Sequence, residues 1–161
     1  VSLLSFSPDS QRVTYVGYRG KQVHIVTDGV ESRGYELVGE SPIQFSPDSH
    51  HVAYLTMRDG KNRLVLDGKE GTDYDWFGGA LAFSPDSRHV AFLAGRGRMA
   101  AGAQAEKVFV VVDGRESRPY LGIVPGLAFA GNNAVRVIAV RLNEQTAEFE
   151  IVRVELSVPE T

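Results

Sequence analysis

Short alternations of apolar and polar residues run through most of this chain. Residues 51–55, His-Val-Ala-Tyr-Leu, are the type example, and the same pattern occurs at 12–16 and 89–93. In an extended strand, the valine and the aromatic residue two positions later lie on one face. Apolar runs at 3–6, 42–45 and 80–83, each ending in phenylalanine, precede these segments and predict a buried strand. The pattern therefore predicts an all-β protein.

A turn motif, Phe-Ser-Pro-Asp-Ser, joins the members of each strand pair. It occurs at 6–10, 45–49 and 83–87, and a degenerate fourth copy without the proline begins at Phe129. Proline presets the backbone of a tight turn, and Ser and Asp side chains bond nearby backbone N–H groups. The four phenylalanines are 39, 38 and 46 residues apart. A period near 40 built from short strands is typical of a β-propeller.

A second motif, Asp-Gly-x-Glu, fixes the register of the repeat. It occurs at 28–31, 67–70 and 113–116, and a tyrosine follows each aspartate by seven residues, at Tyr35, Tyr74 and Tyr120. Asp-Gly favours the tight reversal of a hairpin, so we expect it to join the third and fourth strands of each blade. We interpret the acids as turn residues rather than calcium ligands, and the tyrosines as core. The fourth strand of the second blade is expected to carry Tyr74 and Trp76.

These motifs predict one domain of four antiparallel blades, over residues 1–39, 40–78, 79–124 and 125–161. The last blade is expected to lack its fourth strand, because residues 157–161 are short and broken by Pro159. The third blade is longer, since its phenylalanine and aspartate are 30 residues apart rather than 22. We expect the extra length, near residues 95–106, to form an exposed loop between its second and third strands.

These repeats resemble the WD40-like (PD40) propeller repeats of the TolB family, on the aromatic-Ser-Pro-Asp-Ser turn, the Val-x-aromatic strand and the aliphatic strand ending in Asp-Gly. The resemblance covers residues 1 to about 156. It implies a bacterial β-propeller and a periplasmic or extracellular location. The same repeat type occurs in the non-catalytic propellers of prolyl-oligopeptidase-like and tricorn-like peptidases. The fourth copy departs from the pattern, because it has neither the proline turn nor Asp-Gly-x-Glu.

Composition narrows the function little. The chain has 161 residues, with 17 Lys plus Arg against 20 Asp plus Glu, for a net charge of −3. That charge gives no reason to expect a nucleic acid partner. The sequence contains no cysteine, so disulfides and thiolate chemistry are excluded. No apolar run has the length of a membrane span. The first residue is Val1, which suggests a processed chain or a fragment.

Motifs for catalysis, metals and cofactors are missing from the sequence. No Gly-x-Ser-x-Gly nucleophile elbow and no His-Glu-x-x-His occurs. His51 and His89 hold the same repeat position one blade apart, so we expect polar surface residues rather than joint metal ligands. We therefore predict no catalytic residues, no metal site and no cofactor. A central-channel metal site is disfavoured because the first strands of the blades carry no acid or histidine.

Residues that vary between repeats gather in the loops between the second and third strands. Geometry places these loops at one end of each blade and the Ser-Pro-Asp-Ser and Asp-Gly turns at the other. The first end is rich in bases and the second in acids, which predicts a basic face opposite an acidic one. The irregular loops of a repeat protein commonly form its ligand-binding face. The candidate ligand-binding residues are Tyr18, Arg19, Lys21, Arg58, Lys61, Arg96, Arg98 and Lys107.

Two hypotheses for function follow. The first is a non-catalytic interaction module that holds a protein, peptide or anionic ligand on the irregular loop face, so that the chain is not an enzyme. The second is an accessory propeller of a larger enzyme, such as a prolyl-oligopeptidase-like or tricorn-like peptidase. An array of blades that does not close leaves apolar faces uncovered. We therefore expect about half of a larger propeller, or association with a second copy.

Overall fold

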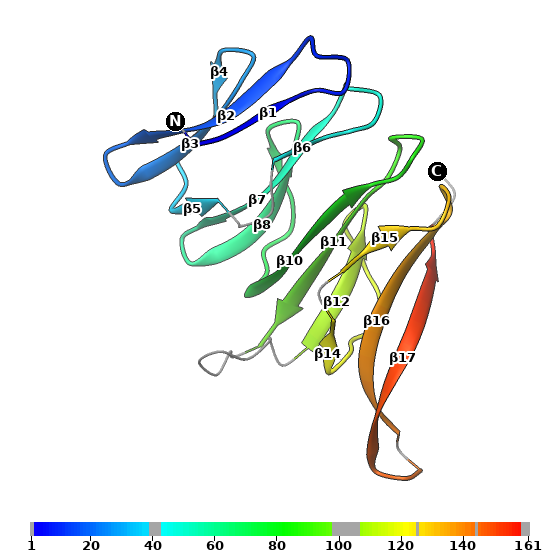
Figure 1. The fold of residues 1–161 in the computed structure, drawn as a ribbon. Coiled ribbons are helices and arrows are strands. Elements are labelled where there is room, and N and C mark those ends of the chain that lie inside the picture. Colours follow the sequence, from blue (N-terminus) through cyan, green and yellow to red (C-terminus); the bar gives the residue numbers. More distant parts are fainter. Residues whose placement is uncertain (1, 39–42, 98–106, 125, 144, 159–161) are drawn as a thin grey trace. The chain divides into compact units, whose positions relative to one another are not determined.

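Only β-strands form regular structure in the computed structural model, which describes residues 2–38, 43–97, 107–124, 126–143 and 145–158 (Figure 1). The strands belong to four antiparallel sheets. The fold is thus all-β and built of blade-type sheets, as predicted. The chain divides into two compact units, Val1–Asp73 and Tyr74–Thr161, with two sheets in each.

The first unit contains the first and second sheets. The first sheet has the strand order of the sequence: β1 (Ser2–Phe6), β2 (Val13–Arg19), β3 (Gln22–Thr27) and β4 (Val30–Glu31). In the second sheet, two short strands pair with the same edge of the long strand β7 (Val52–Arg58): β5 (Leu37–Val38) and β6 (Gln44–Phe45). On the other edge of β7 follow β8 (Lys61–Leu66) and then β9 (Lys69–Glu70).

The second unit repeats this plan. The third sheet comprises β10 (Trp76–Phe83), β11 (Val90–Arg96), β12 (Lys107–Val112) and β13 (Arg115–Glu116). The fourth comprises β14 (Gly122–Ile123) and β15 (Ala128–Phe129) on one edge of β16 (Ala134–Asn143), with β17 (Glu148–Ser157) on the other. No strand of the described residues pairs with the outer edge of β17, which agrees with the expected incomplete blade.

The Ser-Pro-Asp-Ser segment folds as a self-contained turn. The Ser46 hydroxyl donates to Asp48 Oδ1, and the same oxygen accepts the backbone N–H of His50. These bonds lower the pKa of Asp48 to about 2, the Ser46 contact being the larger cause. The final serine adopts a left-handed conformation, with φ of 68° at Ser49, so the chain reverses within the motif. Equivalent Ser-to-Asp bonds occur in the first and third sheets.

The Asp-Gly turn binds the start of the second strand as well as reversing the chain. Asp67 and Gly68 have φ of 49° and 76°, which suits a primed hairpin turn. The Asp67 carboxylate accepts the backbone N–H of Val52 at 2.9 Å, and the Asp67 backbone N–H donates to the Val52 carbonyl at 2.9 Å. The same pair of bonds recurs at Asp28 with Val13 and at Asp113 with Val90. These contacts support the interpretation of the aspartates as structural turn residues.

Each unit has its core between its two sheets. In the first unit the core consists of residues from β2, β3, β7 and β8 and two residues beside them: Val16, Val23, Ile25, Tyr35, Ile43, Val52, Tyr54 and Val65. In the second unit, Leu93, Val108 and Val110 of the third sheet pack with Val135, Val137 and Ala139 of the fourth. The alternation predicted from sequence therefore buries one face of each sheet against its neighbour.

Several expectations for single residues can be compared with this fold. Tyr35, Tyr74 and Tyr120 are core residues as predicted, with at most 4% of their surface exposed. Trp76 was assigned wrongly to the fourth strand of the second blade; it begins β10 and pairs with Gly95 in the third sheet. Its assignment failed because the fourth strand, β9, ends at Glu70, two residues after the Asp-Gly turn.

The expected boundaries of the four blades stay a prediction, while the sheets occupy residues 2–31, 37–70, 76–116 and 122–157. The extra length of the third repeat lies between β11 and β12, as expected. Most of that segment, residues 98–106, lies outside the described residues. Over the residues that are described, no helix has the length and apolarity needed to cross a membrane.

Candidate functional site

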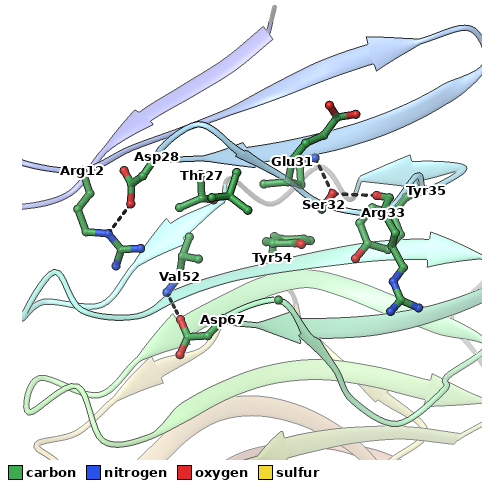
Figure 2. A pocket seen from close by; sticks show the side chains of 13 residues that line it. Arg12, Thr27, Asp28, Glu31, Ser32, Arg33, Tyr35, Val52, Tyr54 and Asp67 are labelled. Atoms are coloured by element: carbon green, nitrogen blue, oxygen red, sulfur yellow. Dashed lines mark hydrogen bonds and ion pairs between the residues drawn. The ribbon is translucent and has the colours of Figure 1, made fainter.

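The brevity of the fourth strands leaves a cleft between the sheets of the first unit. β4 ends after two residues; the Ser32 backbone N–H still donates to the Ile25 carbonyl, and the chain then detours until Tyr35, which pairs with Val23. A cleft of about 520 Å³ opens beside this detour, between the first and second sheets (Figure 2). Its lining residues are Arg12, Ile25, Thr27, Asp28, Val30, Glu31, Ser32, Arg33, Tyr35, Val52, Tyr54, Asp67 and Gly68.

One end of the cleft is formed by an ion pair between Arg12 and Asp28. Arg12 Nε lies 2.8 Å from Asp28 Oδ2. The Arg12 guanidinium also donates to the carbonyls of Ser49 and His50, in the turn of the second sheet, and lies over the ring of Phe45 at 5.3 Å. The hydrogen bond from Arg12 is the main reason that the pKa of Asp28 is lowered. Arg12 therefore holds the two sheets together and keeps Asp28 ionised.

Two tyrosines, Tyr35 and Tyr54, form the floor of the cleft. Their rings meet edge to face, with centroids 6.1 Å apart, and each side chain is 2% exposed. Burial raises the pKa of both phenols, and for Tyr54 the contact with the Tyr35 hydroxyl raises it further. Both hydroxyls are therefore protonated at neutral pH, so each can donate and accept a hydrogen bond.

The other end carries Ser32 and Arg33 from the segment after β4. The Ser32 hydroxyl accepts the backbone N–H of Ile25 at 2.9 Å and donates to the Arg33 carbonyl at 2.8 Å. The Arg33 side chain is 61% exposed, and its Nε lies 3.6 Å from Glu70 Oε1. Figure 2 shows Arg33 and Tyr35 at one end of the cleft and Arg12 and Asp28 at the other, with Tyr54 between them.

The other acids of the lining are also paired. Asp67 Oδ2 lies 2.7 Å from His51 Nδ1, and Glu31 lies within 3.0 Å of both Arg19 and His24. Each ionisable residue of the lining thus has an oppositely charged or ionisable neighbour. What the cleft offers a ligand is a set of mixed donors and acceptors beside the apolar side chains of Ile25, Val30 and Val52.

The candidate residues from sequence lie at the hairpins between second and third strands, as expected. Those in the first sheet are Tyr18, Arg19 and Lys21, those in the second Arg58 and Lys61, and those in the third Arg96 and Lys107. Arg98 lies outside the described residues. The site itself stays a prediction, and none of the seven described residues among these candidates lines the cleft described above.

The predicted separation of a basic end from an acidic end is wrong for three of the arginines. Arg19, Arg58 and Arg96 each form an ion pair with the glutamate of the Asp-Gly-x-Glu motif of their own sheet, at 2.9, 3.0 and 2.6 Å. The fourth strand is only two residues long, so its glutamate lies within reach of the arginine that ends the second strand. Charges expected at opposite ends therefore neutralise each other.

His89 was also expected on the surface, but it is 7% exposed. Its Nδ1 lies 2.7 Å from Asp113 Oδ2, as His51 Nδ1 does from Asp67. Arg12 occupies the same repeat position and binds Asp28 in the same way. The position is therefore a partner of the Asp-Gly aspartate. Among the described residues, no three His, Asp or Glu side chains lie close enough together to hold a metal ion.

Sequence reasoning missed the cleft because it treated the lining residues that it discussed as strand, turn or core positions. One signal was available. Only six residues lie between Asp28 and the buried Tyr35, and Gly29 of the turn is one of them. Residues 31–34, Glu-Ser-Arg-Gly, lack the apolar alternation that predicts a strand.

Comparison with known proteins gives one informative result. No protein family model and no curated protein matches the sequence. A solved structure that is similar is a protein from Bacteroides uniformis proposed to be a 6-phosphogluconolactonase. It is 12% identical, with a TM-score of 0.42, and the match covers 96% of this chain and 54% of the other. This chain thus spans about half the length of the solved structure it matches.

That result overturns the expectation of a non-catalytic interaction module and of a chain that is not an enzyme. The expectation rested on the lack of catalytic motifs in a repeat fold, whereas the solved structure with similar sheets is a protein proposed to be an enzyme. A fold of this kind gives no ground for excluding catalysis. At 12% identity the likeness concerns the fold, and the other protein's activity is not carried over to this chain.

Proposed function

We propose that the cleft of the first unit binds a small, uncharged, hydroxyl-rich molecule, of the size of a monosaccharide or a cyclic polyol. The observation that carries the proposal is the pairing of every charged residue in the lining. Its volume, about 520 Å³, is in the range of roughly 300–1,000 Å³ common for small-molecule sites.

The charge pairing disfavours a charged ligand. An anion would have to compete with Asp28 for Arg12, and a cation would have to compete with Arg19 for Glu31. Arg33 shares Glu70 with Arg58 and Arg63, so the phosphate probe in the titration tests whether it attracts an anion. A hydroxyl group has no such competitor, because it both donates and accepts and can add to an existing pair. The guanidinium and carboxylate groups at the two ends present donors and acceptors side by side.

The apolar part of the lining supports the same ligand class. Ile25, Val30 and Val52 lie along the cleft, and Tyr54 contributes an aromatic ring to its floor. Sugars and cyclic polyols carry C–H faces as well as hydroxyl groups, so they can contact both kinds of surface. Val30 is 73% exposed and lies at the rim, where it can contact a bound molecule without reorganising the core.

The test is a titration of the ¹⁵N-labelled chain with glucose, mannose, myo-inositol and inorganic phosphate, followed by amide chemical shifts. We expect an uncharged probe to shift amides of the cleft lining and to leave the second unit unchanged. The variant Arg33→Ser should weaken binding about 10-fold, since it removes a hydrogen-bonding group worth about 1.4 kcal/mol.

Arg118→Ser is the matched control. Arg118 holds the same repeat position in the third sheet, beside Tyr120, and does not line the cleft. It should bind as the unmodified chain does. Shifts caused by phosphate alone would contradict the proposal, because they would show that the cleft recognises charge. Equal losses in both variants would also contradict it.

We propose further that the repeats are of the WD40-like TolB type. The support is local: in three sheets the Ser-Pro-Asp-Ser turn and the Asp-Gly turn form the same hydrogen bonds at the same positions. Replacing residues 130–133 with the consensus turn Ser-Pro-Asp-Ser tests this. The fourth sheet should then gain the same turn, visible as stabilisation and as new slowly exchanging amides, and a loss of stability would contradict the assignment.

A further inference from the structure

In each unit, the earlier sheet packs on the later one through one face, and the later sheet uses the opposite face of the repeat for the same contact. The strand register makes Val16, Leu93 and Ile138 equivalent, since each lies three residues after the valine that pairs with the repeat phenylalanine. Val16 packs against the second sheet and Leu93 against the fourth, and both are 1% exposed. We call this side the trailing face, because the following sheet covers it.

The trailing face of the fourth sheet is open to solvent. Ile138 is 47% exposed. Leu142 pairs with Phe149 and Val140 with Ile151, so these side chains lie on the same face. Leu142, Phe149 and Ile151 are 46%, 74% and 76% exposed. Two charged groups bound this apolar surface: Arg153, which pairs with Ile138, and the ion pair of Arg136 and Glu155 at 2.7 Å. The apolar surface therefore lies in the half of the sheet near the β16–β17 hairpin.

The leading face is the side that packs on the preceding sheet. Phe45 and Ile43 of the second sheet pack on the first, and Phe129 and Leu127 of the fourth pack on the third. In the first sheet the equivalent residues are Phe6 and Leu4, and they are 62% and 57% exposed. One chain thus exposes the leading face of its first sheet and the trailing face of its fourth sheet. Faces of these two kinds pack on each other once in each unit.

We propose that this chain associates head to tail with a second copy, the trailing face of the fourth sheet of one copy packing on the leading face of the first sheet of another. Large exposed apolar side chains gathered on one face are typical of an interaction surface. The partner is specified by the repeat: in both units a trailing face is covered by a leading face of the same construction. A contact between unlike faces is heterologous, so each copy can take part in two.

The test uses one variant for each face and sedimentation velocity. Phe149→Asp with Ile151→Asp disables the trailing face, and Phe6→Asp disables the leading face; all three positions are more than half exposed, so folding should persist. We expect the unmodified chain to sediment as an assembly of at least two copies and each variant alone as a 17.6 kDa monomer. A mixture of the two variants should form a dimer, because each supplies the face that the other lacks.

Val30→Asp is the matched control for assembly, since Val30 is 73% exposed and lies on neither of the two faces that the proposed contact joins, the leading face of the first sheet and the trailing face of the fourth. It should assemble as the unmodified chain does. A monomeric unmodified chain would overturn the proposal and would leave further sheets of a longer polypeptide as the cover of both faces. Assembly that survives in the trailing-face variant, or failure of the mixture to dimerise, would also overturn it. Far-ultraviolet circular dichroism of each variant separates loss of association from loss of fold.

Discussion

The junction between the first and second sheets and the junction between the third and fourth are two versions of one construction. In both, a two-residue strand leaves a space next to the following sheet. In the first unit this space is the cleft of about 520 Å³, whose lining mixes polar and apolar groups. In the second it is a cavity of about 300 Å³ that Val110, Val112, Leu156 and Val158 make more apolar, although Arg115 and Glu116 also line it.

The difference between the two junctions comes from few positions. By strand register, Val137 stands in the fourth sheet where Tyr54 stands in the second, and Leu156 stands where Asp67 stands. The second junction therefore lacks the phenol that Tyr54 contributes to the floor of the first cleft. It also lacks the carboxylate that Asp67 contributes to the lining, which we call the wall. The comparison teaches that the backbone of the repeat makes the space, and that a few side chains decide whether it can recognise a polar molecule.

The largest expected effect is on the floor of the first junction. Tyr54→Ala should lower the free energy of unfolding by about 3–5 kcal/mol, because it removes a fully buried aromatic side chain and leaves a cavity. Val137→Ala removes less volume at the equivalent position and should cost about 2 kcal/mol. Urea denaturation measures both, and Val30→Ala, at an exposed site, should change little. Equal costs at Tyr54 and Val137 would break the comparison.

A smaller effect is expected in the wall. Asp67→Asn keeps a residue that tolerates positive φ but disturbs the contact with His51, so it should cost about 1 kcal/mol. It should also weaken any ligand that binds the first cleft. Asp59→Asn, in a position whose side chain is 82% exposed, is the control and should be neutral. If both variants have the same stability, the wall carboxylate contributes nothing to the difference between the junctions.

The smallest effect concerns pH. The Ser46 hydroxyl lowers the pKa of Asp48 to about 2 from 3.8, so the ionised form is favoured in the folded state. Its contribution to stability is present above roughly pH 4 and is lost as the pH falls toward about 2. The fourth sheet has Asn132 and Asn133 in place of this turn. Asp48→Asn should therefore flatten the pH dependence of the urea midpoint between about pH 4 and 2, and an unchanged slope would contradict this.

The sequence was sufficient for the scaffold because its signals are local. Phe-Ser-Pro-Asp-Ser and Asp-Gly-x-Glu each close their own turn through bonds to residues a few positions away, as at Ser46 with Asp48 and at the Asp67–Gly68 reversal. Strand alternation then identifies the buried faces. The all-β class, the sheet pairing and the three core tyrosines follow from such signals.

The candidate site could not be predicted in the same way, because its residues meet only across two sheets. Arg12 and Tyr54 belong to different repeats, and nothing in either repeat alone indicates that they line one cleft. Long side chains are also the reason that the predicted separation of basic and acidic ends is wrong. Arg58 and Glu70 were assigned to opposite ends of the blade, yet their side chains lie 3.0 Å apart. Position along a strand does not determine where a guanidinium lies.

The hydrogen bonds of the Asp-Gly aspartate have a consequence for how this chain tolerates change. Asp113, directly after β12, forms hydrogen bonds with the backbone of Val90 at the start of β11. These bonds join the open end of the β11–β12 hairpin and do not involve the chain that connects the two strands. The third repeat keeps these bonds although its phenylalanine and aspartate are 30 residues apart rather than 22. A hairpin clamped at its base can accept foreign sequence at its tip.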